Sequence, residues 1–170
     1  MKIKEFFMSL NKTFKFYKRI LLFLLLIFSF DIFLDFDKTN LCDSNSTLLK
    51  NKILGLSPSS SPIMLNDLTE FEWDKVYSFS PYTTKKDIYE TIGLNFNIAK
   101  TVSEGMNHMM FLNRDEVVCY LYGYPDETKY YISLDCSFYE NGIGVAHFDD
   151  NILFDVSTSD SILTLTHIID

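Results

Sequence analysis

The amino-terminal segment of the chain places a group of basic residues directly before a long apolar run. The uncharged run extends from residue 20 to residue 30 and contains only Leu, Ile, Phe and one serine. The basic residues that precede it are Lys2, Lys4, Lys12, Lys15, Lys18 and Arg19. Positive charge followed by an apolar block is typical of a segment that enters a membrane with its basic side left in the cytoplasm. The pattern therefore predicts a cytoplasmic tail over residues 1–19 and a transmembrane segment over residues 20–36.

The length and the flanks of the apolar run leave two fates open. The run is interrupted by Asp31, so its length is closer to the ~10–14 residues of a signal-peptide core than to the ~20 of a full span. Signal peptidase, however, prefers small residues before its cut, and residues 28–30 and 33–35 are bulky or charged. A leucine directly before Cys42 also departs from lipoprotein processing sites. We expect an uncleaved, single-pass signal anchor in the cell membrane, with secretion after signal cleavage as the alternative.

Charge is distributed unevenly along the chain. Residues 1–35 carry six basic and three acidic side chains, and residues 36–170 carry nine basic and twenty acidic ones, which gives +3 and −11 within the total of −8. Nucleic-acid binding requires a basic face, so the acidic part argues against a nucleic-acid partner. It fits a solvated surface, or a surface that meets a cationic partner.

The segment after the apolar run reads as a tether. Residues 43–47 are polar, and residues 57–62 form a Ser/Pro spacer of the kind that is extended and weakly structured. We therefore expect a Ser/Pro-containing tether over residues 37–70, with a short helix possible only near residues 48–54. The extracytoplasmic folded domain is then expected over residues 71–170.

The pattern after residue 71 predicts an α+β domain. A strand over residues 73–79 is followed by a helix that Thr84 and Asp87 can cap and that Gly93 ends. Short turns separate six further β-rich segments, which predicts an antiparallel meander with the helix packed on one face. Those six segments are residues 107–113, 116–124, 130–138, 144–149, 152–157 and 162–168.

Two of the three cysteines fall in neighbouring predicted strands. If the strands over residues 116–124 and 130–138 pair as a hairpin, Cys119 and Cys136 lie opposite one another at a separation near that of a disulfide. An oxidising exterior favours such a bond. We predict a Cys119–Cys136 disulfide, the alternative being two buried thiols or a shifted register. Cys42 is left as a free thiol or as a link between two copies of the chain.

No catalytic motif is visible. The histidines are His108, His147 and His167, and the chain lacks a nucleophile elbow, a zinc-protease helix motif, a phosphate-binding glycine loop and a Cys-x-x-Cys pair. A metal-dependent hydrolase would need the histidines to converge with Asp149 or Asp155. Met106, His108 and Met110 suit a soft metal such as copper, but alternation in a strand explains them better as core residues. We expect no enzyme and no cofactor.

Tyrosines are unusually dense in the predicted hairpin, at Tyr120, Tyr122, Tyr124 and Tyr130. Tyrosine is enriched at interfaces because its ring packs while its hydroxyl stays hydrated. These four residues are our candidate interaction surface, against the alternative that they only shield a one-sided sheet.

The start of the predicted domain resembles that of a known group of proteins. Phe71-Glu-Trp-Asp-Lys-Val-Tyr-Ser-Phe-Ser-Pro-Tyr82, the capped helix Thr84–Gly93 and the hairpin near residue 115 resemble small bacterial membrane-anchored or lipoprotein-type proteins that open with F-x-W-D-x-V-Y-x-F-x-P-Y. The resemblance covers residues 71–124. It implies an extracytoplasmic bacterial domain, and because the group has no assigned activity it implies no catalytic residue.

These observations favour a membrane-anchored binding module that recognises an extracytoplasmic protein or an envelope polymer. Two other classes remain open. An immunity-type inhibitor would neutralise a basic toxin through its acidic surface, and a metal-dependent hydrolase would use the histidines.

Overall fold

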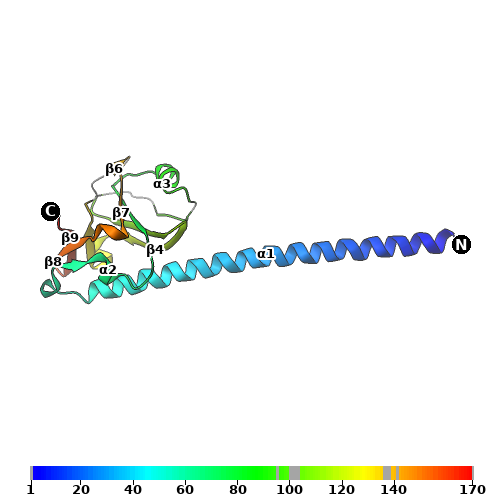
Figure 1. Cartoon of the computed structure of the whole chain (residues 1–170), viewed down its shortest axis with the longest axis horizontal. Helices are drawn as coiled ribbons and strands as arrows, with labels where there is room; N and C mark the ends of the chain where they lie inside the picture. Colours follow the sequence, from blue (N-terminus) through cyan, green and yellow to red (C-terminus); the bar gives the residue numbers. More distant parts are fainter. Residues whose placement is uncertain (1, 95, 100–103, 136–138, 141, 170) are drawn as a thin grey trace. The chain divides into compact units, whose positions relative to one another are not determined.

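The computed structural model describes residues 2–94, 96–99, 104–135, 139–140 and 142–169, without the side chains of residues 2–16, 28, 30–39 and 139–140 (Figure 1). The chain divides into two units, residues 1–40 and residues 41–170, and each is considered by itself. Helix α1, Lys2–Leu54, begins in the first unit and ends in the second. Within the described residues, no helix combines the length and apolar character that a membrane crossing needs.

The compact unit begins at Leu41 rather than near Phe71, so the predicted tether over residues 37–70 was wrong. The last turns of α1 bury one side of the helix, with Cys42, Asn45, Leu49 and Ile53 each at most 6% exposed. This spacing is that of an amphipathic helix face packed on a core. The rest of the predicted tether also belongs to the unit, in the short elements η1 (Pro58–Ser60), β1 (Ile63–Met64) and α2 (Leu65–Leu68).

The described strands form two sheets, which confirms an α+β fold but not a single meander. One sheet has the order β4-β3-β2-β7-β6 and is antiparallel throughout, while the other has the order β1-β8-β9-β5 and contains a parallel β5–β9 pair. Their bounds are β2 Lys75–Phe79, β3 Asn107–Asn113, β4 Glu116–Gly123, β5 Tyr130–Ser133, β6 Tyr139–Glu140, β7 Ile143–His147, β8 Leu153–Ser159 and β9 Ile162–His167.

The predicted hairpin between residues 116–124 and 130–138 does not form, because β4 and β5 lie in different sheets. The connecting segment folds as a single helical turn, α4 (Pro125–Thr128), which Lys129 ends with a left-handed backbone at φ 68°. The chain is thereby carried to the second sheet instead of back along β4. Two predicted hairpins are confirmed, β3 with β4 and β8 with β9.

Helix α3, Lys85–Ile92, forms as the sequence predicts. The Thr84 hydroxyl oxygen accepts from the backbone N–H of Asp87 at 3.1 Å, and Gly93 ends the helix at φ 70°, a left-handed conformation that glycine adopts without strain. Ile88 and Ile92 are buried against the five-stranded sheet's own apolar residues.

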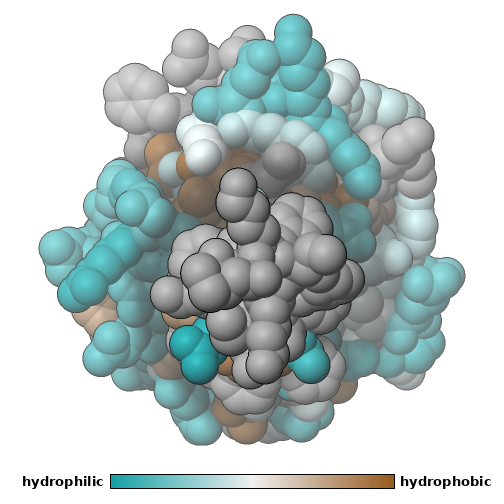
Figure 2. Space-filling model, turned by 90° about the vertical axis from the view of Figure 1, so that its right-hand side faces the viewer, coloured by the Kyte–Doolittle hydropathy of each residue, from teal (hydrophilic) through white to brown (hydrophobic). Residues whose placement is uncertain are grey.

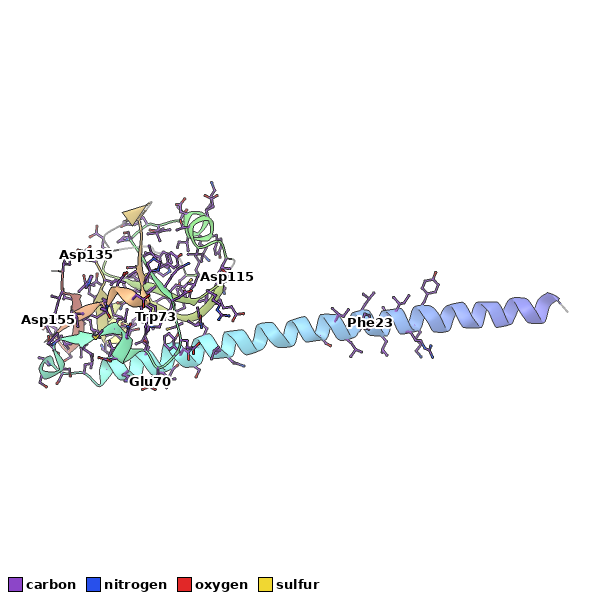
Figure 3. All side chains as sticks on the ribbon, viewed as in Figure 1. Phe23, Glu70, Trp73, Asp115, Asp135 and Asp155 are labelled. Carbon is purple, nitrogen blue, oxygen red and sulfur yellow. The ribbon has the colours of Figure 1, made fainter. Side chains whose placement is uncertain are left out.

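Apolar side chains cover both faces of the five-stranded sheet. One cluster of described residues joins Val76 and Phe111 with the second sheet and with Leu49 and Ile53 of α1, and Trp73 packs edge-on against Phe111 at 5.4 Å (Figure 3). The other cluster lies on the α3 side and includes Phe79, Ile88, Ile92, Ile98, Met110, Leu112 and Ile143. Around the residues drawn in grey, the space-filling view shows mostly hydrophilic residues with apolar areas between them (Figure 2).

Buried amide and hydroxyl side chains cap the edges where the layers meet. Asn107 of β3 donates to the Tyr130 carbonyl at 2.8 Å and accepts from the Ile132 N–H at 2.9 Å, so its amide pairs with the outer edge of β5. On edge strand β4, Asn45 donates to the Val118 carbonyl at 2.8 Å. Such edges would otherwise leave backbone groups without partners inside the protein.

Asn107→Ala should therefore destabilise the protein strongly. The change leaves the buried N–H of Ile132 without a partner, while the Tyr130 carbonyl keeps its second donor, the Thr128 hydroxyl at 2.9 Å. We expect the free energy of unfolding, measured by urea denaturation, to fall by roughly 1–3 kcal/mol. Asn51→Ala, on the exposed side of α1, is the control and should change it little. Equal stability of the two variants would contradict the role given to Asn107.

Candidate functional site

The structure separates the four tyrosines of the predicted interaction surface. Tyr120 and Tyr122 lie two residues apart on β4, with their rings stacked at 5.9 Å and 8° between planes. Tyr122 is 54% exposed, whereas Tyr130 is only 2% exposed and lies in the other sheet. Tyr124 is half-buried at the start of α4. The candidate surface is thus centred on Tyr120 and Tyr122, and Tyr130 belongs to the core.

The hydroxyl of Tyr120 is anchored beneath this surface. Its oxygen accepts from the backbone N–H of Ala99 at 2.8 Å and lies 2.9 Å from Nε2 of His108. A neutral imidazole that accepts the hydroxyl proton at Nε2 carries its own proton on Nδ1. These contacts fix the Tyr120 ring, on which Tyr122 stacks.

His108 is a buried, neutral histidine. It is 2% exposed, its ring lies 4.7 Å from that of Phe79, and its Nδ1 has no hydrogen-bond partner among the described residues. Desolvation by burial lowers the pKa of His108 to about 4. Burial likewise raises the pKa of Tyr120 to about 12. Neither group is set up to carry charge near neutral pH.

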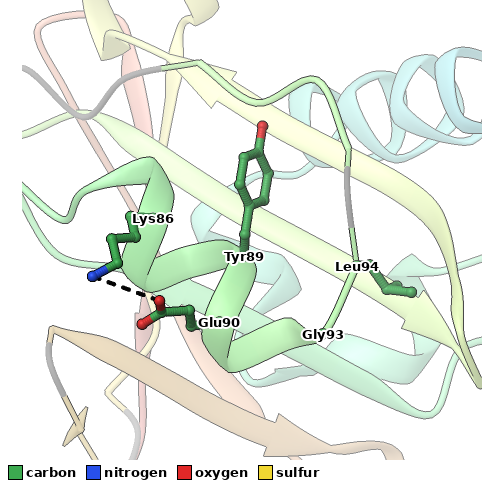
Figure 4. Close-up of a pocket in the computed structure, with 5 residues that line it drawn as sticks. All are labelled: Lys86, Tyr89, Glu90, Gly93 and Leu94. Atoms are coloured by element: carbon green, nitrogen blue, oxygen red, sulfur yellow. Dashed lines mark ion pairs between the residues drawn. The ribbon is translucent and has the colours of Figure 1, made fainter.

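A shallow pocket lies beside α3, close to the surface that Tyr120 and Tyr122 form. It has a volume of about 630 Å³ and is lined by Lys86, Tyr89, Glu90, Gly93 and Leu94 (Figure 4). The Lys86 ammonium pairs with the Glu90 carboxylate at 3.6 Å on the outer side of the helix. The Tyr89 hydroxyl donates to the Phe96 carbonyl at 2.7 Å, and the Phe96 ring meets Tyr120 edge-on at 5.8 Å.

The histidines do not converge. His147 lies opposite Lys75 at the beginning of β2, His108 packs beside Phe79 at its end, and His167 belongs to the other sheet. Within the described part of the chain, no group of three His, Cys, Asp or Glu side chains could hold a metal ion. The arrangement that a histidine-based hydrolase requires is therefore not formed. The alternation of His108 with Met110, both at most 2% exposed, places them in the core.

The predicted Cys119–Cys136 disulfide loses its geometric basis, because the hairpin on which it depended is not formed. Cys136 lies outside the described residues, so the bond itself stays a prediction. Cys119 is a fully buried thiol of β4, and Cys42, expected in an open tether, is only 3% exposed.

Sequence reasoning missed the partners of Tyr120. Residues 94–105 carry no clear periodicity, and Ala99 contributes only a backbone N–H, which no side-chain pattern reports. The buried contact between Tyr120 and His108 could have been suspected from the register of β3 and β4. This register places Tyr122 opposite His108, and Tyr120 lies two residues away on the same strand.

No family model, no curated protein and no solved structure matches the chain.

The pKa of His108 predicts a loss of stability in acid. In the unfolded chain His108 becomes protonated near pH 6.5, whereas in the folded protein it stays neutral down to about pH 4. The unfolded state thus holds more protons between these values, and stability falls as the pH falls through this window. The full shift corresponds to roughly 3 kcal/mol.

Urea denaturation at a series of pH values between 7.5 and 4 tests this. The wild-type protein should lose roughly 3 kcal/mol more than His108→Gln over that range. His147→Gln, which changes an exposed histidine, should behave like the wild type. Identical pH profiles for the wild type and His108→Gln would show that His108 is not the group responsible.

Proposed function

We propose that this chain is a membrane-anchored binding module, non-enzymatic, that holds its compact unit outside the cytoplasm and meets a protein partner through Tyr120 and Tyr122. The observation that supports the anchor is the apolar character of every residue of α1 from residue 20 to residue 27. Every one of these eight apolar side chains is exposed, from 41% at Ile20 to 64% at Phe23, which projects from the helix in Figure 3.

An eight-residue run covers all sides of a helix, at 3.6 residues per turn. A helix packed on a protein surface hides only a stripe, whereas one that is apolar all round belongs in a core or in lipid. The hydroxyl of Ser29 donates to the Leu26 carbonyl at 2.9 Å, so this polar group is satisfied within the helix itself. Lipid is the environment that accepts such a surface on every side.

The orientation of the anchor follows from the basic tail. An excess of Lys and Arg before the apolar run favours a cytoplasmic amino terminus, which leaves the compact unit outside. The resemblance of residues 71–124 to small bacterial extracytoplasmic proteins supports the same side.

The partner is inferred from charge and from the tyrosines. With nine basic and twenty acidic side chains after residue 35, the module would repel an anionic envelope polymer and attract a protein with a basic face. Stacked, partly hydrated tyrosines suit such a contact. An immunity-type inhibitor of a basic toxin would use the same complementarity and is the alternative function.

The anchor can be tested with the full chain synthesised in the presence of phosphatidylcholine–phosphatidylglycerol vesicles. We expect the wild-type chain to float with the vesicles after alkaline extraction. The double change Leu24→Lys and Leu25→Lys should abolish flotation, because each lysine near the centre of a span costs roughly 2.5–3.5 kcal/mol.

The control is Leu48→Lys, a change at an exposed leucine of the same helix within the compact unit. It should float like the wild type. A wild-type chain that stays in the unbound fraction, or a double variant that floats as well as the control, would refute the anchor.

The partner surface can be tested by photo-crosslinking in intact cells, with p-benzoylphenylalanine in place of Tyr122. We expect one discrete adduct, resolved by mass spectrometry as a protein. The control is the same replacement at Tyr82, which is 67% exposed outside the stacked pair. An adduct of equal yield from both positions, or none from Tyr122, would count against this face as the contact surface.

A further inference from the structure

Two buried free cysteines distant in the sequence, Cys42 of α1 and Cys119 of β4, lie near one another. Ser46 lies between them, since its hydroxyl is 3.5 Å from the Cys119 sulfur and donates to the Cys42 carbonyl at 2.7 Å. The Cys42 thiol, one helical turn before Ser46, lies close enough to the Ser46 side chain and to the backbone of Tyr120 for both to lower its pKa against the larger effect of burial. Both thiols are thus held around one hydroxyl group.

Ser46 also fixes the register of this contact. Its hydroxyl oxygen accepts from the Tyr120 N–H at 3.0 Å and lies 3.1 Å from the Tyr120 carbonyl, while neighbouring Asn45 bonds to the Val118 carbonyl. The helix therefore cannot slide along β4 without breaking these hydrogen bonds, of which that of Asn45 is buried and those of Ser46 are partly buried. Cys42 and Cys119 therefore stay near one another as long as α1 is packed on β4.

We propose that Cys42 and Cys119 are a disulfide-forming pair, and that their bond fastens helix α1 to edge strand β4. In forming it, each thiol gives up one proton and one electron, a sulfur–sulfur bond is made, and a disulfide oxidant is reduced to two thiols. The oxidant class is a small-molecule or protein disulfide, which the exterior of the cell supplies if the proposed location holds.

Burial and topology distinguish this pairing from the two links that the sequence suggested. A link between two copies through Cys42 would need that sulfur at the surface, and Cys42 is 3% exposed. A Cys119–Cys136 bond was expected from a hairpin of β4 with β5, and these two strands belong to different sheets. Of the two cysteines that the structure describes, Cys42 lies near the Cys119 thiol, and both lie beside the Ser46 hydroxyl.

The same burial makes disulfide formation slow while α1 is packed on β4. Desolvation raises the pKa of Cys42 to about 11 and that of Cys119 to about 12, so the thiolates that attack disulfides are scarce. We expect the bond to form during folding, or when α1 lifts briefly from β4, and to resist reductants afterwards. The crosslink would hold the strand that carries Tyr120 and Tyr122 against the last turns of α1.

The test uses the purified full-length chain in detergent, unfolded and refolded in a buffer of oxidised and reduced glutathione. After alkylation with N-ethylmaleimide and digestion without reductant, mass spectrometry should find the Cys42–Cys119 peptide pair in the wild type and in Cys136→Ser. The pair should be absent from Cys42→Ser. Reductant should lower the unfolding midpoint of Cys136→Ser by several degrees and leave that of Cys42→Ser unchanged.

A Cys119–Cys136 peptide pair, or full alkylation of Cys42 and Cys119 in the refolded protein, would overturn the proposal. Because the oxidant is supplied in the buffer, the result does not depend on where the protein resides in the cell. If the purified chain forms the bond and protein isolated from cells lacks it, the proposed extracytoplasmic location fails and the pairing stands.

Discussion

Two sheets that share a core bring strand edges into the interior, where backbone N–H and C=O groups have no water to bond. In this protein the amide of Asn107 meets that constraint for β5, because it bonds to the Tyr130 carbonyl and the Ile132 N–H as a neighbouring strand would. The Asn107 side chain thereby links β3 of the five-stranded sheet to β5 of the four-stranded sheet by hydrogen bonds. A buried N–H of β5 without such a partner would destabilise the packing between the sheets.

The end of α1 meets the same constraint at β4. Asn45 and Ser46 bond to the outer backbone groups of this edge strand, while Leu49 and Ile53 of the same helix enter the core. An open edge would offer a template for pairing with other chains. The helix is consequently an integral part of the fold, and the face that carries Tyr120 is built on the strand that it caps.

Local signals in the sequence predicted the local structure well. The capped helix α3 and the β3–β4 and β8–β9 hairpins follow from turn and capping chemistry over a few residues. The division into two sheets and the parallel β5–β9 pair depend on contacts between distant segments, which local patterns do not encode. Asn45 and Ser46 looked like part of a polar linker. The residue type alone does not show whether a polar side chain faces water or bonds to the edge of a buried strand. The site was found only in part, since Tyr120 and Tyr122 were among its candidates but the backbone N–H of Ala99 leaves no trace in the sequence.

The central claim is that residues 20–36 hold the chain in a membrane, with the compact unit outside the cytoplasm. Protease treatment of intact cells that express the chain with a carboxyl-terminal tag tests it most directly, with chain length and membrane association read from the same blot. The account predicts a full-length, membrane-bound chain whose tag is digested. A tag that survives until the cells are lysed would place the acidic unit in the cytoplasm and contradict the claim, and a shortened chain in the medium would show that the segment is a cleaved signal rather than an anchor.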